Sequence, residues 1–357
     1  MKYDFLIIGG GIAGISIGGR LAPNGSVCVL ETEDSIGYHA SGRSAAMFLE
    51  NYGNDIVVEL NKASTPYHKK GGYLTDRGLM SLGRSQDKDS FLAEINAMNL
   101  EQISISEALD LFPIINTKSV EYVSFLKQAP DLDTDKILQD FAKMVRRNNG
   151  VIKTKTNVKN IKKLAESWRV ETNKESFEGT ILINAAGAWV DEVALMANVQ
   201  PLDFIPMRRS IARVPSPTAA STGNWPMVHG VGDRWYAKPD AGAWLISPCE
   251  EHPMHPHDAF ADDMVLAEGI DRYSKMVNHE ITSLQTSWAG LRTFSQDHAL
   301  VIGFDKSTKD FFWFAGQGGY GFQTAPAASQ LASELILSNA TSLAKATVEA
   351  LSPKRFD

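Results

Sequence analysis

A glycine-rich turn close to the N-terminus constrains the fold more than any other feature of this 357-residue chain. Its sequence, Gly9-Gly10-Gly11-Ile12-Ala13-Gly14, fits the pattern G-x-G-x-x-G. The turn follows the apolar run Phe5–Gly9 and opens a predicted helix over Ile12–Leu21, after which a second apolar run, Ser26–Leu30, ends at Glu31. This order of strand, helix and strand predicts a dinucleotide-binding unit of the Rossmann type.

The positions of the motif have separate physical reasons. Gly9 permits the tight turn, Gly11 lets the backbone approach a pyrophosphate, and Gly14 allows close packing of helix and strand. The helix N-terminus offers free N–H groups and a positive dipole end to phosphates, and an acidic residue after the second strand accepts ribose hydroxyls. The alternative is a glycine turn without a ligand. We expect these residues to bind a dinucleotide: Gly9, Gly11, Ile12, Ala13, Gly14 and Glu31.

Charge and cysteine content exclude several classes of protein. The net charge is −7, from 35 basic and 42 acidic residues, which makes nucleic acid a poor partner. Two cysteines, Cys28 and Cys249, cannot build a disulfide framework and fit a reducing compartment, so we expect a cytoplasmic location. The uncharged stretch Phe311–Ser333 carries too many glycines and glutamines for a membrane span.

A cysteine- and histidine-rich segment, residues 249–258, contains ligand types that suit zinc. Two prolines break any helical spacing in it, and no second ligand cluster accompanies it. We therefore expect a solvated loop there, near the mouth of a site, and no bound metal.

The remaining pattern predicts an α/β chain with a Rossmann-like domain assembled from separated pieces. Asp133–Arg147 reads as an amphipathic helix capped by Asp133 or Thr134, and strand-like runs follow it. The region from 206 to 289 is rich in tryptophan, tyrosine and proline and alternates like strands. We expect a nucleotide-binding domain from 1–70, 146–205 and 290–357, and a β-rich α+β substrate domain from 71–145 and 206–289.

The motif alone does not distinguish NAD from FAD, but distant glycine-rich segments favour FAD, which must be contacted along its whole length. Three segments qualify: Gly42–Ala46 with a helix start at Ser44, Asn184–Trp189 after a buried strand, and Gly316–Gly321 before a helix. That last helix is expected from about Thr324, with Pro326 in its first turn. The positive end of that last helix suits the flavin's electron-rich N1–C2=O edge. The cofactor residues expected here are Arg43, Ser44, Ala45, Ala46, Ala186, Gly187, Trp189, Gly318, Gly319, Tyr320, Gly321, Phe322 and Gln323.

The motifs together resemble a known superfamily. GGGIAG with Glu31, GYHASGRSAA, INAAGAW, WAGLRTF and FAGQGGYGFQT, in this order, are similar to the glycine oxidase, sarcosine oxidase and D-amino-acid oxidase superfamily, and most to D-arginine dehydrogenase-like flavoenzymes. The resemblance implies non-covalent FAD, oxidation of an amine or amino acid, and contact of the N–H groups near Val158 with the adenine end. Neither cysteine lies in the C-terminal glycine segment, so no flavin–cysteine bond is expected.

Oxidising an α-amino acid requires a carboxylate clamp and an aimed Cα–H bond, and the planar arginine fork is the best clamp. The resemblance places substrate-clamping arginines at Arg292 and Arg209, and active-site tyrosines at Tyr52 and Tyr236. Surface salt bridges and core aromatics are the alternatives. No general base is needed if the substrate amine enters neutral.

Three departures from the resembled enzymes refine the expectation. Met47 replaces a histidine and Leu79 an acid that pairs with a cationic side chain, so a neutral or apolar D-amino acid is favoured. Its oxidation to the imino acid moves a hydride from Cα to flavin N5. Leu245 stands where relatives place an oxygen-activating lysine, and Lys238, beside Pro239, is expected in a turn. We therefore expect a quinone or dye-like electron acceptor rather than oxygen.

Three alternative functions stay open. They are a glycine- or sarcosine-type amine oxidase, an FAD-dependent 2-hydroxy-acid dehydrogenase, which would need a base to take the hydroxyl proton, and a flavoprotein used only for binding. The first two share the small-molecule substrate and the cofactor of the leading hypothesis.

Overall fold

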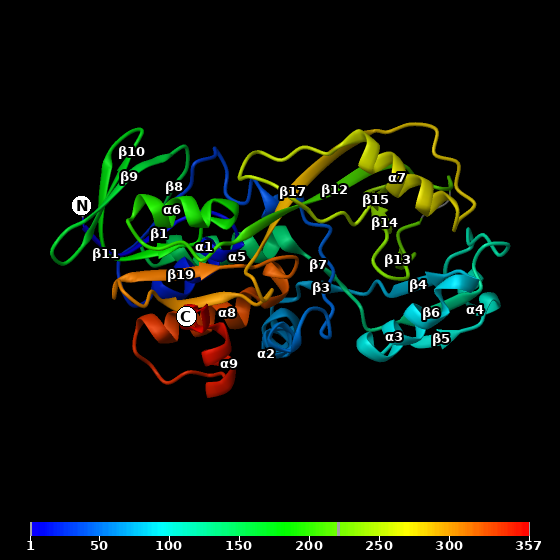
Figure 1. The fold of residues 1–357 in the computed structure, drawn as a ribbon, viewed down its shortest axis with the longest axis horizontal. Helices are drawn as coiled ribbons and strands as arrows, with labels where there is room; N and C mark the ends of the chain where they lie inside the picture. The colour runs from blue at the N-terminus through cyan, green and yellow to red at the C-terminus, as the bar shows by residue number, and fades with distance from the viewer. Residues whose placement is uncertain (1, 220–221, 357) are drawn as a thin grey trace.

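The computed structural model describes residues 2–219 and 222–356. Within them, two large sheets dominate, one of eight strands and one of nine, and a two-stranded pair, β3 (Leu74–Thr75) and β7 (Asp131–Leu132), lies apart from them. Figure 1 shows the first sheet beside both termini and the second sheet on the opposite side of the molecule. The expected α/β architecture with a second β-rich region is confirmed.

The first sheet is built around β1 (Lys2–Ile8), which pairs in parallel with β2 (Val27–Leu30) and with β11 (Ser176–Asn184). Helix α1 (Ile12–Leu21) connects β1 to β2 with the bounds that the sequence predicts. The other strands of this sheet are β8 (Val151–Lys153), β9 (Val158–Lys163), β10 (Trp168–Thr172), β18 (Val301–Phe304) and β19 (Phe311–Ala315).

Both faces of the first sheet are buried, which explains its nearly continuous apolar strands. On β1, Phe5 and Ile7 belong to the core under α1, whereas Leu6 and Ile8 belong to the core on the opposite face. The first face is covered by α1, by α5 (Thr134–Arg147) and by α8 (Gly321–Ile336), and the second by α6 (Val190–Met196).

Helix α5 has the predicted bounds and cap, because the Asp133 side chain accepts a hydrogen bond from the N–H of Lys136. It packs along α1, on the first sheet. The expected range 71–145 therefore includes a helix that packs on the first sheet.

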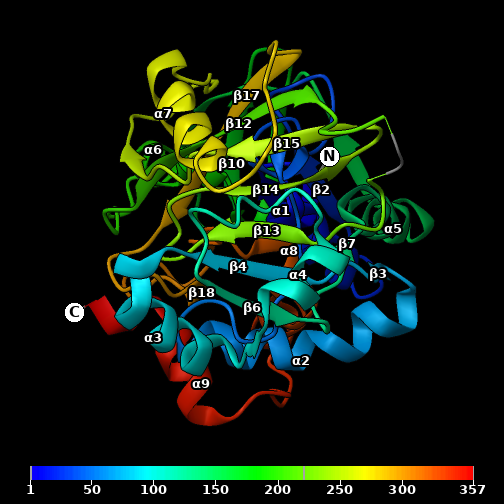
Figure 2. The same ribbon diagram turned by 90° about the vertical axis from the view of Figure 1, so that its right-hand side faces the viewer.

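The second sheet lies in front in Figure 2, which views the molecule from the side opposite the first sheet. Its longest strand, β12 (Ile205–Pro215), pairs along its length with β17 (Thr286–Phe294). The expected boundary at residue 290 therefore divides a strand. The other members are β4 (Leu79–Gly83), β5 (Glu101–Ile103), β6 (Tyr122–Leu126), β13 (Met227–Gly230), β14 (Tyr236–Asp240), β15 (Ala243–Ser247) and β16 (His252–Pro253).

The remaining helices are α2 (Asp55–Gly71), α3 (Lys88–Met98), α4 (Ile105–Leu111), α7 (Asp263–Ser274) and α9 (Lys345–Leu351), with short 3-10 turns η1 (Ala40–Arg43), η2 (Ser85–Asp87), η3 (Gly187–Trp189) and η4 (Pro353–Phe356). None of the helices in the described ranges is long and apolar enough to cross a bilayer.

Two predicted helix starts are wrong. Helix α8 begins at Gly321 rather than near Thr324, so Pro326 lies in its second turn. Ser44 does not start a helix: it ends η1 in an extended conformation, with φ −82° and ψ 135°.

Candidate active site

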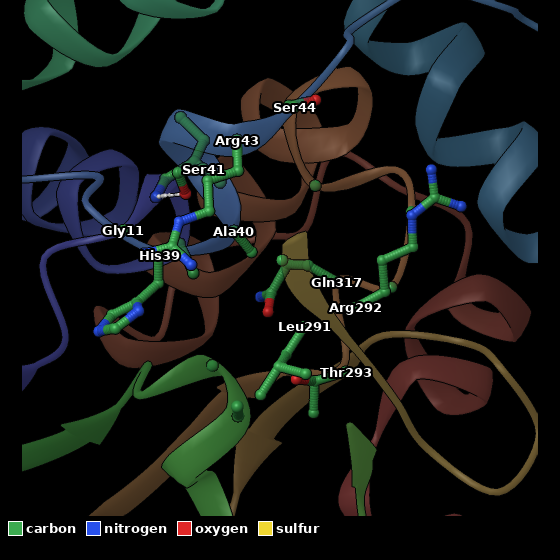
Figure 3. Close-up of a pocket in the computed structure, with 18 of the residues that line it drawn as sticks. Gly11, His39, Ala40, Ser41, Arg43, Ser44, Leu291, Arg292, Thr293 and Gln317 are labelled. Carbon is green, nitrogen blue, oxygen red and sulfur yellow. Dashed lines mark hydrogen bonds between the residues drawn. The ribbon is translucent and has the colours of Figure 1, made fainter. Parts of the chain in front are cut away.

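A cavity of about 560 Å³ lies between the two sheets, within the size range of small-molecule sites. It extends from the N-terminal glycine turn to Arg209 and Tyr236 on the second sheet. Figure 3 shows Gly11 and Ser41 on one side of this space and the Arg292 side chain projecting on the other, with Leu291 and Gln317 between them.

The glycine turn forms one end of the cavity. A Cβ added at Gly14 would lie 1.8 Å from the carbonyl oxygen of Gly9, so Gly14 is needed for packing beneath the turn. A Cβ at Gly11 would meet only the Ser41 hydroxyl, at 3.2 Å, so the backbone there is open to the cavity. This cradle fits the backbone approach that a pyrophosphate requires.

Glu31 is buried beside this turn and holds it. One carboxylate oxygen accepts the N–H of Gly10 at 2.7 Å and the other accepts the N–H of Glu33 at 2.9 Å. An ionised carboxylate offers about four acceptor positions, so capacity for ribose hydroxyls remains.

The N-terminus of α1 also faces the cavity. The Ile12 N–H donates to the Ser41 hydroxyl at 3.0 Å, and no side chain caps the helix at Gly11. Free N–H groups at a helix N-terminus favour phosphate.

Arg43 lines the cavity, but its guanidinium binds other protein groups rather than facing a free ligand position. It donates to the carbonyls of Ala259 and Ala289 at 2.9 and 2.8 Å and pairs with Asp258 at 2.5 Å. Arg43 therefore fastens β17 and the segment around Asp258 to the cofactor side of the site.

The C-terminal glycine loop lines the middle of the cavity. Helix α8 starts there without a side-chain cap at Tyr320, which leaves its first N–H groups for a ligand. The Tyr320 hydroxyl donates to the His298 carbonyl, and the Gln323 side chain accepts the N–H of Leu49. Gln323 thus orders the chain around Leu49, and it also lines the cavity, where the sequence predicts a cofactor contact.

The structure brings the predicted site residues together. Gly14 lies beneath the turn, and each of the other predicted cofactor and substrate residues, including Val158 on β9, lines this cavity.

The two predicted substrate-binding arginines, Arg209 and Arg292, differ in whether an acidic side chain pairs with them. Arg209 is 9% exposed and its guanidinium pairs with Glu251 at 2.7 Å. The guanidinium of Arg292 forms no hydrogen bond or ion pair with any residue that the structure describes, and it lies against Gly319, where an added Cβ would approach its Nη1 to 2.9 Å. Within the described part of the chain, the positive charge of Arg292 is therefore not compensated by a hydrogen-bonded or ion-paired neighbour.

Tyr236 and Cys249 lie beside these arginines. Burial raises the pKa of the Tyr236 phenol, and the positive charges of Arg292 and Arg209 oppose that rise. Burial likewise raises the pKa of the Cys249 thiol to about 11, against the same two charges. Both side chains are thus protonated at neutral pH, and Cys249 is a poor nucleophile, which agrees with a flavin that is not attached to it.

The segment 249–258 is only partly the solvated loop that we expected. Cys249 lines the cavity, and Glu250 is buried next to Arg208, whose Nε lies 3.8 Å from a carboxylate oxygen. Arg208 lies on strand β12, so the surroundings of Glu250 include a distant strand that no local sequence pattern indicates. No group of three metal-ligating side chains occurs among residues 2–219 and 222–356.

Lys238 is buried in β14, so the prediction that it lies in a turn is wrong. Its ammonium donates to the Ala45 carbonyl at 2.9 Å and pairs with Asp131 at 2.5 Å. Arg77 binds the other oxygen of Asp131 at 2.7 Å. Leu245, on the adjacent strand β15, is the register partner of Lys238. The lysine therefore connects the second sheet to the segment around Ala45 that lines the cofactor side.

Four further residues at the substrate end were missed by sequence reasoning: Met98, Met227, His229 and Asp233. His229 carried no usable pattern in the sequence. The fold brings α3 and β13 to one wall, and only that long-range packing identifies the four residues.

Comparisons with known proteins agree with this geometry. The family model described as "FAD dependent oxidoreductase" matches residues 4–335. A glycine oxidase from Bacillus licheniformis is 23% identical over 95% of this chain and 94% of its own length.

Solved structures share the fold over nearly the whole chain. An L-alpha-glycerophosphate oxidase from Mycoplasma pneumoniae with FAD bound has a TM-score of 0.83 at 19% identity, covering 96% of both chains. An L-proline dehydrogenase from P. horikoshii has a TM-score of 0.82 at 23% identity, covering 99% of this chain and 98% of its own.

Proposed function

The chain belongs to the FAD-dependent oxidoreductase family and uses FAD, and on that premise we propose that it oxidises a D-amino acid with a neutral side chain to the imino acid. The observation that carries the proposal is Arg292, an uncompensated cation in a cavity that also contains the cofactor cradle. An α-carboxylate is the natural partner of such a guanidinium.

Different residues of the site would contact different parts of FAD. The glycine turn and the N-terminus of α1 would hold the phosphates, Glu31 would hold the ribose, and the N-terminus of α8 would hold the ring system. When bound, FAD supplies the electron chemistry and takes up the hydride from the substrate Cα. The protein's task is to fix the substrate in one orientation.

Arg292 does this by binding the carboxylate through two parallel N–H bonds, which set direction as well as charge. Arg209 is buried and already paired with Glu251, so it adds positive potential rather than a second free fork. Tyr236 and Tyr52 line the same cavity, and we propose that their phenols donate to the carboxylate or form a wall of the pocket.

Proton transfer places few demands on the site. If the substrate amine enters neutral, its nitrogen lone pair forms the C=N bond as the hydride leaves Cα. No side chain then has to act as a base. A 2-hydroxy acid would need a base for its hydroxyl proton, and this favours the amino acid.

The proposal of a D-amino acid rests on the sequence resemblance to D-arginine dehydrogenase-like enzymes. The proposed preference for a neutral side chain rests on Met47 and Leu79. A panel tests both. We expect anaerobic mixing of the yellow protein with D-amino acids to bleach its flavin, and L-amino acids, glycine, sarcosine and 2-hydroxy acids to act more slowly. Bleaching only by 2-hydroxy acids, or only by glycine and sarcosine, would assign the alternative functions, and no bleaching at all would leave a binding role.

The electron acceptor is tested separately. The first electron given to oxygen creates an anion, which a nearby free cation stabilises. Leu245 offers no charge, Lys238 is bound to Asp131, and Arg292 is assigned here to the substrate carboxylate, so we propose a quinone or dye-like acceptor. Enzyme reduced anaerobically should reoxidise slowly in air-saturated buffer and rapidly with a quinone analogue. Reoxidation by air at the rate of turnover, with stoichiometric hydrogen peroxide, would identify an oxidase.

A further inference from the structure

The two predicted substrate-binding arginines lie on one face of the second sheet. Met207 on β12 is the register partner of Arg292 on β17, and Arg209 is two residues further along β12. Side chains two residues apart on a strand share a face, so Arg209 and Arg292 are diagonal neighbours, at a spacing that long side chains span. Both line the cavity. Two free guanidinium groups in this arrangement would bind a ligand that carries two carboxylates.

Glu251 changes this balance because it binds one of the two arginines. Its Oε1 accepts a hydrogen bond from the Nη2 of Arg209 at 2.7 Å, and its side chain is 45% exposed, whereas that of Arg209 is 9% exposed. The carboxylate therefore reaches the buried guanidinium from the solvent side. A buried cation without a counter-charge is destabilising, so this contact helps to hold Arg209 in the cavity wall.

The position of Glu251 follows from strand pairing. Strand β16 begins at His252, which is the register partner of Arg208 on β12. The two acids just before β16 therefore meet two consecutive arginines, which point to opposite faces of β12. Glu250 lies near Arg208 on one face, and Glu251 pairs with Arg209 on the face that lines the cavity.

The other acidic groups near the two arginines do not take this role. Asp233 lines the cavity but is exposed at its rim. Burial raises the pKa of the Tyr236 phenol and of the Cys249 thiol, so both stay uncharged at neutral pH. A ligand carboxylate that approaches Arg209 has to displace Glu251 or lie beside it, and like charges that close repel each other.

We propose that Glu251 is a specificity-determining residue that excludes substrates with a second carboxylate. Because it occupies Arg209, the guanidinium left for a ligand carboxylate at the substrate end of the described structure is that of Arg292. This inference rests on the proposed amino-acid function and narrows it. Acidic D-amino acids are excluded by charge rather than by size, and an uncharged side chain of the same shape is accepted.

Pairs of equal shape test the effect of charge alone. D-glutamate and D-glutamine differ in whether the side chain ends in a carboxylate or an amide, as D-aspartate and D-asparagine do. We expect kcat/KM for flavin reduction by the parent protein to favour the amide member of each pair. Glu251→Gln keeps the size and an acceptor for Arg209 but removes the charge, so it should shift that ratio toward the acid by roughly 10- to 100-fold. The shift should shrink in high salt, which screens the freed charge.

Three further variants separate charge from structure. Glu251→Asp keeps a carboxylate and should keep the preference for the amide. Arg209→Met combined with Glu251→Gln should cancel the shift, because the second carboxylate then has no guanidinium to bind. Asp240→Asn breaks the comparable ion pair with Arg213, on β12 but outside the cavity lining, and should leave the ratio unchanged.

Acids without the amine separate failure of this inference from failure of the proposed function. Glutarate and glutaramate correspond to D-glutamate and D-glutamine, and their binding is read from the absorbance of the bound flavin. If no amino acid bleaches the flavin, the proposed function fails. Tighter binding of glutaramate than of glutarate by the parent protein, with that order lost in Glu251→Gln, still supports the inference.

Several results would overturn the role of Glu251. They are a parent protein that prefers the dicarboxylate, a ratio that Glu251→Gln leaves unchanged, and equal tightening of both acids in Glu251→Gln, which would make Arg209 a second clamp for the α-carboxylate. A flavin that no amino acid bleaches, together with binding of neither acid, would also overturn it.

Discussion

Replacing Gly14 by alanine is expected to remove FAD from the purified protein. The added Cβ would lie 1.8 Å from the carbonyl oxygen of Gly9, a backbone atom that cannot move without opening the turn. Gly9 cannot adapt easily, since its φ of +110° already suits only glycine. A tenfold loss of affinity for FAD corresponds to only ~1.4 kcal/mol of binding free energy, and we expect the steric overlap to cost more than that. Flavin released into the supernatant by acid, per mole of protein, measures the loss and also shows whether the flavin is non-covalent.

Gly11→Ala is the matched variant for this experiment. Gly11 has an ordinary φ of −76°, and its added Cβ would meet only the Ser41 hydroxyl. We expect this variant to keep its far-ultraviolet circular dichroism and to lose part of its flavin, because the methyl group enters the cavity at the phosphate end. A Gly14→Ala protein that purifies with full flavin would contradict the structure of the turn, and flavin that remains with the acid pellet would contradict a non-covalent cofactor.

Arg292→Lys is expected to keep the flavin and to lose most of its activity toward amino acids. Lysine preserves the charge but replaces the planar fork by a single ammonium. Losing one charge-assisted hydrogen bond costs about 1.5–3 kcal/mol, or roughly 10- to 150-fold in kcat/KM. The measurement is stopped-flow reduction of the flavin at several substrate concentrations.

Arg213→Lys provides the control for this substitution. Arg213 lies on β12 as Arg209 does, but it pairs with Asp240 at 3.1 Å away from the cavity. Exposed ion pairs contribute little to stability, so this variant should react like the parent protein. Equal kcat/KM values for Arg292→Lys and Arg213→Lys would remove Arg292 from the substrate site.

The sequence predicts those parts of this molecule that depend on neighbouring residues. The unit β1–α1–β2 follows from glycine spacing and two apolar runs, and the bounds of α5 follow from helical periodicity with an Asp133 cap. The family motifs predict which residues line the cavity, because each motif carries its own glycine or arginine to that surface.

Features made by distant packing could not be predicted in this way. Pro239 suggested a turn around Lys238, yet pairing with β15 keeps that segment in a strand. The burial of Glu250 depends on β12, and the surroundings of His229 depend on α3. In each case the neighbour that determines the environment lies far away in the chain.

The contact between Lys238 and Ala45 has a thermodynamic consequence. It joins a strand of the second sheet to a segment that lines the cofactor side, and Asp131 secures it from a third part of the chain. A ligand that binds only the native state adds its binding free energy to the stability of whatever unfolds with its site. FAD therefore stabilises the second sheet as well as the first, and the two regions are expected to melt as one cooperative unit whose melting temperature rises with the concentration of FAD.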